Sequence, residues 1–207
     1  MLSAERIVEL HDQRTLAWHE KADDSSDTNS GAESAWLNAV ALQHRANFDL
    51  WHIEDEARAP GATDAELAAV KRRIDQTNQR RNDLAEQLDG SLLAWLEAQR
   101  LPNAEAPLHS ESPGLMIDRL SILALKVFHT REEAERAEAP SGHKDRNRER
   151  LAILEEQRND LAACLAALWQ QTLSGTRRFK LYRQMKMYND AALNPAIYRK
   201  TLKEPAG

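Results

Sequence analysis

Residues 81–85 read Arg-Asn-Asp-Leu-Ala, and residues 158–162 repeat the same five residues. The same offset of 77 residues places Trp51-His52 on Phe128-His129, so a histidine lies 30 residues before the asparagine of each copy. Self-similarity at a fixed offset is the mark of a duplicated supersecondary unit. We therefore expect two related halves, at about 35–98 and 113–175.

Each half is expected to be a pair of helices. Ala and Leu make up more than a quarter of the chain, which has only seven Gly and seven Pro. Ala and Leu favour helices, whereas strands favour β-branched residues. The few Gly and Pro residues fall between long segments of helical periodicity, so they mark the connections. The expected helices are about 3–20, 35–59, 63–98, 113–137 and 144–174.

A helix, a short break and a helix form an αα-hairpin, and two such hairpins pack into a four-helix bundle. We predict an all-α protein: an antiparallel helical bundle of two pseudo-repeated long αα-hairpins, with an N-terminal helix and a basic C-terminal segment over 176–203. The whole chain, 1–207, is expected to be a single domain. Gly90 falls inside a predicted helix, so we expect a kink or a close helix contact there.

The charge, the cysteine content and the hydropathy of the chain argue against several classes of protein. The formal net charge is −5, which argues against a protein that coats nucleic acid. Cys164 is the only cysteine; it excludes an internal disulfide and lies in an apolar run expected to be core. No apolar run reaches the ~18–20 residues of a membrane span, and the first residues lack a secretory pattern. A cytoplasmic location is expected.

The segment 176–203 holds eight Lys or Arg residues and one acid, Asp190. Such a segment folds back on the acidic body or binds an external anion. Tyr182 and Met185 interrupt the basic residues, and apolar groups of this kind need cover. We therefore favour a segment that caps the bundle, with helix expected as far as Tyr188.

Arg81 and Arg158 take equivalent positions on the apolar stripes of their helices. An arginine there needs an acidic partner, because burial of an unpaired charge is costly. One interpretation is a paired, structural arginine that fixes the register of the helices. The other is an anion anchor that presents a planar guanidinium to a carboxylate or phosphate.

Both halves contain a histidine followed three residues later by an acid: His52 with Asp55, and His129 with Glu132. Residues three apart share a helix face, so the acid can orient the imidazole for general acid/base work or supply a second metal ligand. A structural salt bridge is the alternative interpretation. The spacing matches no established metal motif, so no metal ligand and no cofactor are assigned.

Helix geometry limits which of these residues can meet. At 1.5 Å per residue, Arg81 lies ~15 Å along the hairpin from the level of His52, and Arg158 lies ~7.5 Å from the level of His129. A site that includes these residues must therefore be assembled across the two halves. In the first hairpin we expect His52 and Asp55 to lie at the same level as Lys71 or Arg72. His44 and Asn47 are expected at the same level as Asn78 and Arg81.

Four polar strings resemble a bacterial family catalogued as domain of unknown function 4254. They are NFDLWHIEDEAR (47–58), KRRIDQTNQRRND (71–83), SPGLMIDRLSILALK (112–126) and FKLYRQMKMYNDAALNP (179–195). The resemblance implies an association with glycosyltransferase and surface-polysaccharide genes, and the family supplies no established catalytic roles. The matching positions include His52, Asp55, Arg58, Lys71, Asp75, Asn78, Arg81, Asn82, Asp118, Arg119, Lys186, Asn189 and Asp190.

The second half departs from the fuller pattern of the first. Arg131 stands opposite Glu54, and Glu135 stands opposite Arg58. Because these substitutions change the sign of the charge, two equivalent sites are disfavoured and one composite site is expected.

The leading hypothesis is a protein that binds or transforms an anionic, phosphorylated or nucleotide-linked sugar in surface-polysaccharide biosynthesis. The alternatives are a non-catalytic helical scaffold for glycan-assembly enzymes and a metal-dependent all-α phosphohydrolase. A glycosyltransferase partner and a homodimer are also considered. The catalytic candidates are His52, Asp55 and His129. The substrate-binding candidates are Arg58, Lys71, Asn78, Arg81, Asn82, Asp118, Arg119, Arg158, Asn159, Lys186 and Asn189.

Overall fold

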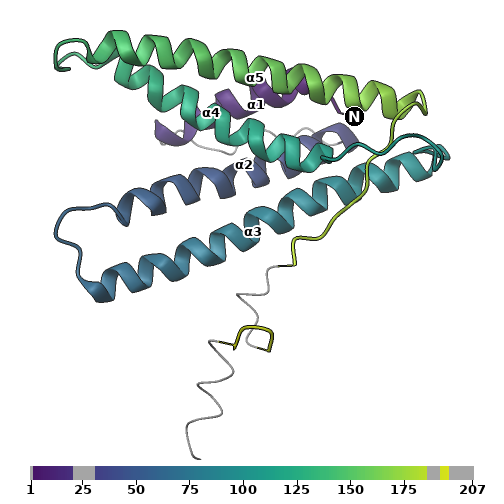
Figure 1. The fold of residues 1–207 in the computed structure, drawn as a ribbon, viewed down its shortest axis with the longest axis horizontal. Helices are drawn as coiled ribbons and strands as arrows, with labels where there is room; N and C mark the ends of the chain where they lie inside the picture. The colour runs from purple at the N-terminus through teal and green to yellow at the C-terminus, as the bar shows by residue number, and fades with distance from the viewer. Residues whose placement is uncertain (1, 21–30, 186–191, 196–207) are drawn as a thin grey trace, which may run out of the picture.

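The computed structural model describes residues 2–20, 31–185 and 192–195, and in this part of the chain the regular secondary structure consists of α-helices (Figure 1). The predicted all-α fold is confirmed, and each predicted helix is present to within a few residues. Among the described residues the only β-type pairing is an isolated bridge between Leu108 and Arg178. The helices are α1 (Ala4–His19), α2 (Ala32–Glu56), α3 (Asp64–Glu97), α4 (Pro113–Glu135) and α5 (His143–Leu173).

The helix ends follow from local sequence. At the start of α3, the Thr63 hydroxyl accepts from the Glu66 N–H and the Glu66 carboxylate accepts from the Thr63 N–H, which is a capping box. Pro113 occupies the first turn of α4, where its missing N–H has no intrahelical partner to lose. Gly142 precedes α5 with φ of 70°, a left-handed conformation that favours glycine.

Two helical hairpins make up most of the bundle (Figure 1). One is formed by α2 and α3, the other by α4 and α5, and α1 packs against α2, α4 and α5. His44 contacts Ser121 and His52 lies near His129, so α2 and α4 run in the same direction. The turns of both hairpins consequently lie at one end of the molecule, and the link from α3 to α4 lies at the other.

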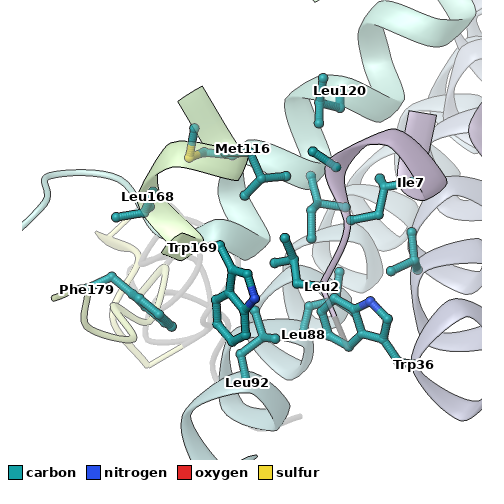
Figure 2. Close-up of a cluster of buried hydrophobic side chains, with 14 of the residues drawn as sticks. Leu2, Ile7, Trp36, Leu88, Leu92, Met116, Leu120, Leu168, Trp169 and Phe179 are labelled. Atoms are coloured by element: carbon teal, nitrogen blue, oxygen red, sulfur yellow. The ribbon is translucent and has the colours of Figure 1, made fainter. Parts of the chain in front are cut away.

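The main apolar core lies at the end where α3 connects to α4. It joins α1, both hairpins and the segment after α5, and Figure 2 shows its central side chains. A second, smaller cluster near the turn of the first hairpin contains Ile53, Val70 and Ile74. The labelled residues of the main core are Leu2, Ile7, Trp36, Leu88, Leu92, Met116, Leu120, Leu168, Trp169 and Phe179.

The close helix contact expected at Gly90 is absent. Helix α3 runs through this residue without interruption, and no atom other than the adjoining residues and backbone of α3 lies within 4 Å of the place where a Cβ would be. The close contact is made by Gly114 in the first turn of α4, where a Cβ would collide with the Ala85 carbonyl oxygen and the Asp89 carboxylate. The absence of a side chain there lets α4 approach α3.

Two further expectations need correction. Residues 176–185 contain no helix; instead Phe179 enters the main core while Tyr182 and Met185 stay exposed. The segment therefore docks through Phe179, and the apolar side chains that were expected to cap the bundle remain uncovered. Cys164 is exposed, because it lies on the outer side of α5 between the buried Leu161 and Leu165.

The described helices contain no stretch that combines the length and the hydropathy needed to cross a membrane.

Candidate functional site

A buried polar layer separates the main core from the histidine-rich region. Its centre is Asp118 on α4, which accepts hydrogen bonds from Gln43 Nε2 at 2.6 Å and Asn47 Nδ2 at 2.9 Å. Arg81 on α3 approaches the same carboxylate, with its Nε 3.3 Å from Oδ1. Three helices thus converge on one carboxylate that is only 11% exposed, which fixes the position of the arginine.

His44 lies in the same layer and links both hairpins to α1. Its Nδ1 accepts from the Ser121 hydroxyl at 2.7 Å, and its Nε2 donates to the His11 carbonyl oxygen at 3.0 Å. Burial lowers the pKa of His44 to about 3, while the hydrogen bond to the His11 carbonyl acts in the opposite direction. Burial also lowers the pKa of His11, as does the positive charge of a protonated His44. Both rings are therefore neutral at physiological pH.

Next to this layer, on the side of the hairpin turns, three histidines from three helices come together. They are His19 from α1, His52 from α2 and His129 from α4, and one ring nitrogen of each lies within 4.8 Å of the others. Ring centroids are 5.2 Å apart for His19 and His52, 4.9 Å for His19 and His129, and 6.0 Å for His52 and His129. We call these three residues the histidine cluster.

Hydrogen bonds fix the orientation of two rings in the histidine cluster. His19 Nδ1 donates to the Thr15 carbonyl oxygen at 2.7 Å, and His129 Nδ1 donates to the Glu132 carboxylate at 2.9 Å. A carbonyl or carboxylate oxygen can only accept, so in the neutral rings Nε2 carries the lone pair. Both Nε2 atoms are buried and form no hydrogen bond within the described part of the chain.

His52, like the other two members of the cluster, is half-buried. Burial lowers its pKa below 6.5, and the charges of His19 and His129 lower it further. The negative charges of Asp55 and Asp49 act in the opposite direction. The first three effects are the larger ones, so His52 is predominantly neutral at physiological pH and has a lone pair available.

Aromatic rings enclose the histidine cluster. Phe128 stacks on His19 with ring centroids 4.3 Å apart, and Trp51 stacks on His129 at 4.8 Å. Phe48 meets the edges of His19 and His52, at 4.9 and 4.4 Å. These rings restrict the motion of the imidazoles and exclude bulk water from part of their surface.

Beside the histidine cluster lies a pocket of about 350 Å³ between α2, α3 and α4. Trp51 lines this pocket and also a second one of about 400 Å³, which includes His129, Lys126 and Arg150. The tryptophan therefore separates the two cavities and contacts the cluster. The first cavity, called the α2–α4 pocket below, is lined by Asn47, Leu50, Trp51, Glu54, Asp55, Arg58, Arg81, Ile122 and Leu125.

The structure brings some of the sequence-predicted site residues together. His52 and His129 meet in the histidine cluster, whereas Asp55, Arg58 and Arg81 line the α2–α4 pocket. Asp118 lies behind Arg81. No hydrogen bond joins Asp55 to His52 among the described residues; Asp55 Oδ1 is 4.0 Å from an Arg58 nitrogen instead.

Other predicted residues lie elsewhere. Arg158 makes a pair with Asp12 on α1, with one nitrogen 2.8 and 2.9 Å from the two carboxylate oxygens. Lys71 pairs with Asp75, and Arg119 pairs with Glu111 near the start of α4. Asn82 is buried and Asn159 is exposed, and neither lines the α2–α4 pocket; Asn78 is half-buried on α3 and does not line it either. Lys186 and Asn189 lie outside the described residues.

Sequence reasoning missed two residues that define the region. His19 is in α1, outside both halves of the repeat, so no internal offset draws attention to it. Trp51 stands opposite Phe128 in the repeat, and this equivalence alone gives it no role at a site. A histidine as the last residue of the first helix, next to the expected loop, was the available signal for His19.

One family model matches most of the chain. The model of a family described as "Protein of unknown function (DUF4254)" matches residues 37–181, which span α2 to α5 and the segment that carries Phe179. The chain belongs to this family. The matched region contains His52, His129 and the α2–α4 pocket, whereas His19 precedes it. No curated protein and no solved structure matches the chain.

Proposed function

We propose that this protein binds an anionic, phosphorylated or nucleotide-linked sugar in the α2–α4 pocket, in a pathway of surface-polysaccharide biosynthesis. The observation that carries the proposal is the lining of that pocket, which combines the tryptophan ring of Trp51 with the guanidinium groups of Arg58 and Arg81. An aromatic face packs on the apolar face of a sugar ring, and guanidinium groups bind phosphate.

Arg81 supports the proposal through its geometry. The ion pair with Asp118 is made through Nε, at 3.3 Å and without a hydrogen bond, and the side chain is 24% exposed. Asp118 therefore holds the guanidinium in place without occupying its outer donors. A guanidinium positioned in advance loses less side-chain entropy when a phosphate binds.

The carboxylates in the pocket complement the rest of such a ligand. Glu54 and Asp55 line it together with Arg58, which donates to Glu54 Oε2 at 3.1 Å. Carboxylate oxygens accept hydrogen bonds from sugar hydroxyls. The pocket thus contains groups for both parts of a phosphorylated sugar.

The histidine cluster supplies acid and base groups next to the pocket. Trp51 connects the two, since it lines the pocket and stacks on His129. The lowered pKa of His52 leaves that ring neutral at pH 7, so it acts as a general base for a hydroxyl or water beside the ligand. His129, held by Glu132, is the second candidate for proton transfer.

Isothermal titration and thermal-shift measurements with nucleoside-diphosphate sugars and sugar phosphates test the proposal. Saturable binding by at least one of these ligands is expected, and Arg58→Ala should weaken it about tenfold or more, because a charge-assisted hydrogen bond is lost. Arg148→Ala is the matched control, since Arg148 is 64% exposed and paired within its helix, as Arg58 is at 65%. Equal binding by both variants would contradict the proposal.

A non-catalytic scaffold for glycan-assembly enzymes is the second candidate function. The observation that favours it is the pairing of both equivalent arginines, Arg81 with Asp118 and Arg158 with Asp12. Under this hypothesis, none of the sugar ligands binds, and a purified glycosyltransferase encoded with this protein forms a complex with it. Binding of a sugar ligand that depends on Arg58 would count against the scaffold.

A further inference from the structure

We propose that His19, His52 and His129 form a binding site for one divalent transition-metal ion, with Zn²⁺ the best match. Because Nδ1 of His19 and Nδ1 of His129 are already hydrogen-bonded, the proposed ligand atoms are Nε2 of each of these residues and one ring nitrogen of His52. This proposal goes beyond sugar binding in the α2–α4 pocket and does not depend on it; with an ion bound, His52 and His129 act as its ligands and no longer as acid and base groups.

The spacing of the ring nitrogens is the first observation. One nitrogen of each histidine lies within 4.8 Å of the other two. Nitrogens bound to zinc at 2.0–2.1 Å in a tetrahedron stand about 3.4 Å apart. The rings therefore need to move toward a common centre by about 1 Å or less, which small changes in side-chain torsion provide.

The hydrogen bonds of the cluster are the second, independent observation. Nδ1 of His19 and Nδ1 of His129 are both occupied as donors, to a carbonyl oxygen and to a carboxylate. Histidines that bind metals are oriented in this way, with the second nitrogen bonded to such an acceptor. The two Nε2 atoms then carry buried lone pairs that no donor in the described part of the chain satisfies. A metal ion would satisfy both.

The surroundings favour a metal over a proton. Three positive charges on imidazoles that lie this close would repel one another. Neutral imidazole is the form that binds metals. Glu132 bonds to His129, and the charges of Asp49 and Asp55 reach His52, so carboxylates near the cluster offset the charge of the ion.

The donor set selects the kind of metal. Imidazole nitrogens suit zinc, copper, nickel and iron, whereas magnesium and calcium require oxygen ligands. Three protein ligands leave at least one coordination position for water or a ligand, which is the arrangement of catalytic rather than structural zinc sites. Such an ion would supply the metal required by a metal-dependent phosphohydrolase.

Metal titration of the full chain tests the proposal. The protein is prepared without an affinity tag, stripped with a chelator and titrated with Zn²⁺ by calorimetry and with Co²⁺ by visible absorption. We expect one equivalent to bind, the intense absorption of a low-coordinate Co²⁺ site, and tighter binding at pH 7.5 than at pH 5.5, since protons compete for the ligand nitrogens.

Four variants assign the site. His52→Ala should remove the Co²⁺ absorption, and Glu132→Gln should weaken Zn²⁺ binding about 10–100-fold, because it loosens His129 without removing a ligand. His109→Ala and His143→Ala are the controls: each changes a half-buried histidine outside the cluster, so neither should change the affinity. Circular dichroism checks that every variant is folded.

Several outcomes would overturn the proposal. These are the absence of stoichiometric binding, a Co²⁺ spectrum unchanged in His52→Ala, and an equal loss in the control variants. If His52→Ala does not fold, nitrogen NMR of the wild-type histidines decides, because zinc must shift the Nε2 resonances of His19 and His129. Sugar binding measured in the presence of chelator separates this proposal from the proposed function, since the Arg58 and Arg81 pocket contains none of the three histidines.

Discussion

The two hairpins share a sequence pattern but bury different surfaces. In the first hairpin, α2 buries the polar side chains of Gln43, His44 and Asn47, which lie one after another along its inner side. In the second, α4 buries mainly apolar residues, and only Asp118 and Ser121 are polar in its central part. The polar residues of α2 bond to these two. The two copies of the duplicated unit thus bury different polar residues, which form hydrogen bonds with one another.

The partners of the equivalent arginines show the same difference. Arg81 in the first hairpin pairs with Asp118 inside the bundle, whereas Arg158 in the second pairs with Asp12 on α1. Helix α1 therefore supplies the acidic partner of the arginine in the second hairpin, as α4 does for the arginine in the first. It also adds His19 to the pair of equivalent histidines, so the additional helix turns a symmetric pair into a three-residue cluster.

The largest expected effect distinguishes the two arginines. Arg81→Met leaves Asp118, which is 11% exposed, without its charged partner, and should cost about 3 kcal/mol of unfolding free energy. Arg158→Met leaves Asp12, which is 46% exposed, and should cost about 1 kcal/mol. Urea unfolding of both variants measures the difference. Equal losses would show that the hairpins do not differ in this respect.

The next effect concerns the contact of α4 with α3. Gly114→Ala places a Cβ against the Ala85 carbonyl and the Asp89 carboxylate, and backbone atoms do not move aside without strain. We expect a loss of about 2–3 kcal/mol in unfolding free energy, as for an overpacked core. The equivalent position in the first hairpin is Leu37, so this restriction applies to the second hairpin alone. Wild-type stability of Gly114→Ala would refute the close approach.

Acidification should destabilise the protein through His11 and His44. Their folded-state pKa values lie below 6.5, so below pH 6.5 the unfolded chain binds protons that the folded chain does not. Each histidine then removes about 1.4 kcal/mol of stability per pH unit. Asp89, with a pKa raised to about 6 mainly by burial, acts in the opposite sense between pH 6 and 3.8. The two histidines together lower the free energy of unfolding more than Asp89 raises it, so the stability falls as the pH is lowered.

Urea midpoints at pH 7, 6 and 5 measure this dependence. Ser121, the equivalent of His44 in the second hairpin, does not titrate, so the effect belongs to the first hairpin and α1. His44→Asn should lower the stability at pH 7, because its bonds to Ser121 and His11 change, and should make the pH dependence weaker. An unchanged pH dependence in this variant would show that His44 does not contribute to the loss of stability at low pH.

The smallest effect has the opposite sign. Gly90→Ala lies in the interior of α3 with open space around the new Cβ, so it should stabilise the protein by about 1 kcal/mol, the difference in helix propensity. Thermal unfolding of Gly90→Ala and Gly114→Ala side by side compares a permissive glycine with a restricted one. Destabilisation by Gly90→Ala would indicate a contact of α3 that the fold does not explain.

Helices and hairpins were predictable from the sequence because they depend on local signals. Pro113, the capping pair of Thr63 and Glu66, and the scarcity of Gly and Pro determine where helices begin and end. The 77-residue offset also placed His52 opposite His129, which the structure brings to 6.0 Å between ring centroids. Such equivalences are visible because duplication leaves them in the order of the chain.

Contacts between side chains on different helices could not be predicted from the sequence. Arg158 turns toward Asp12, and His19 joins the cluster, because α1 packs on one side of an otherwise repeated framework. No periodicity specifies that packing. The same reason explains the error at Gly90: propensity identifies a costly glycine, but only the position of the neighbouring helix shows that Gly114 is the one that must lack a side chain.

The uneven distribution of apolar contacts has a consequence for local opening. The large core lies at one end of the bundle, while the turn of the first hairpin is held mainly by Ile53, Val70 and Ile74. Amide hydrogens near that turn should therefore exchange with solvent faster than those near Leu88. His52 lies next to Ile53, at the border between these regions, so partial opening of the hairpin tip would give solutes access to the cluster without loss of the main core.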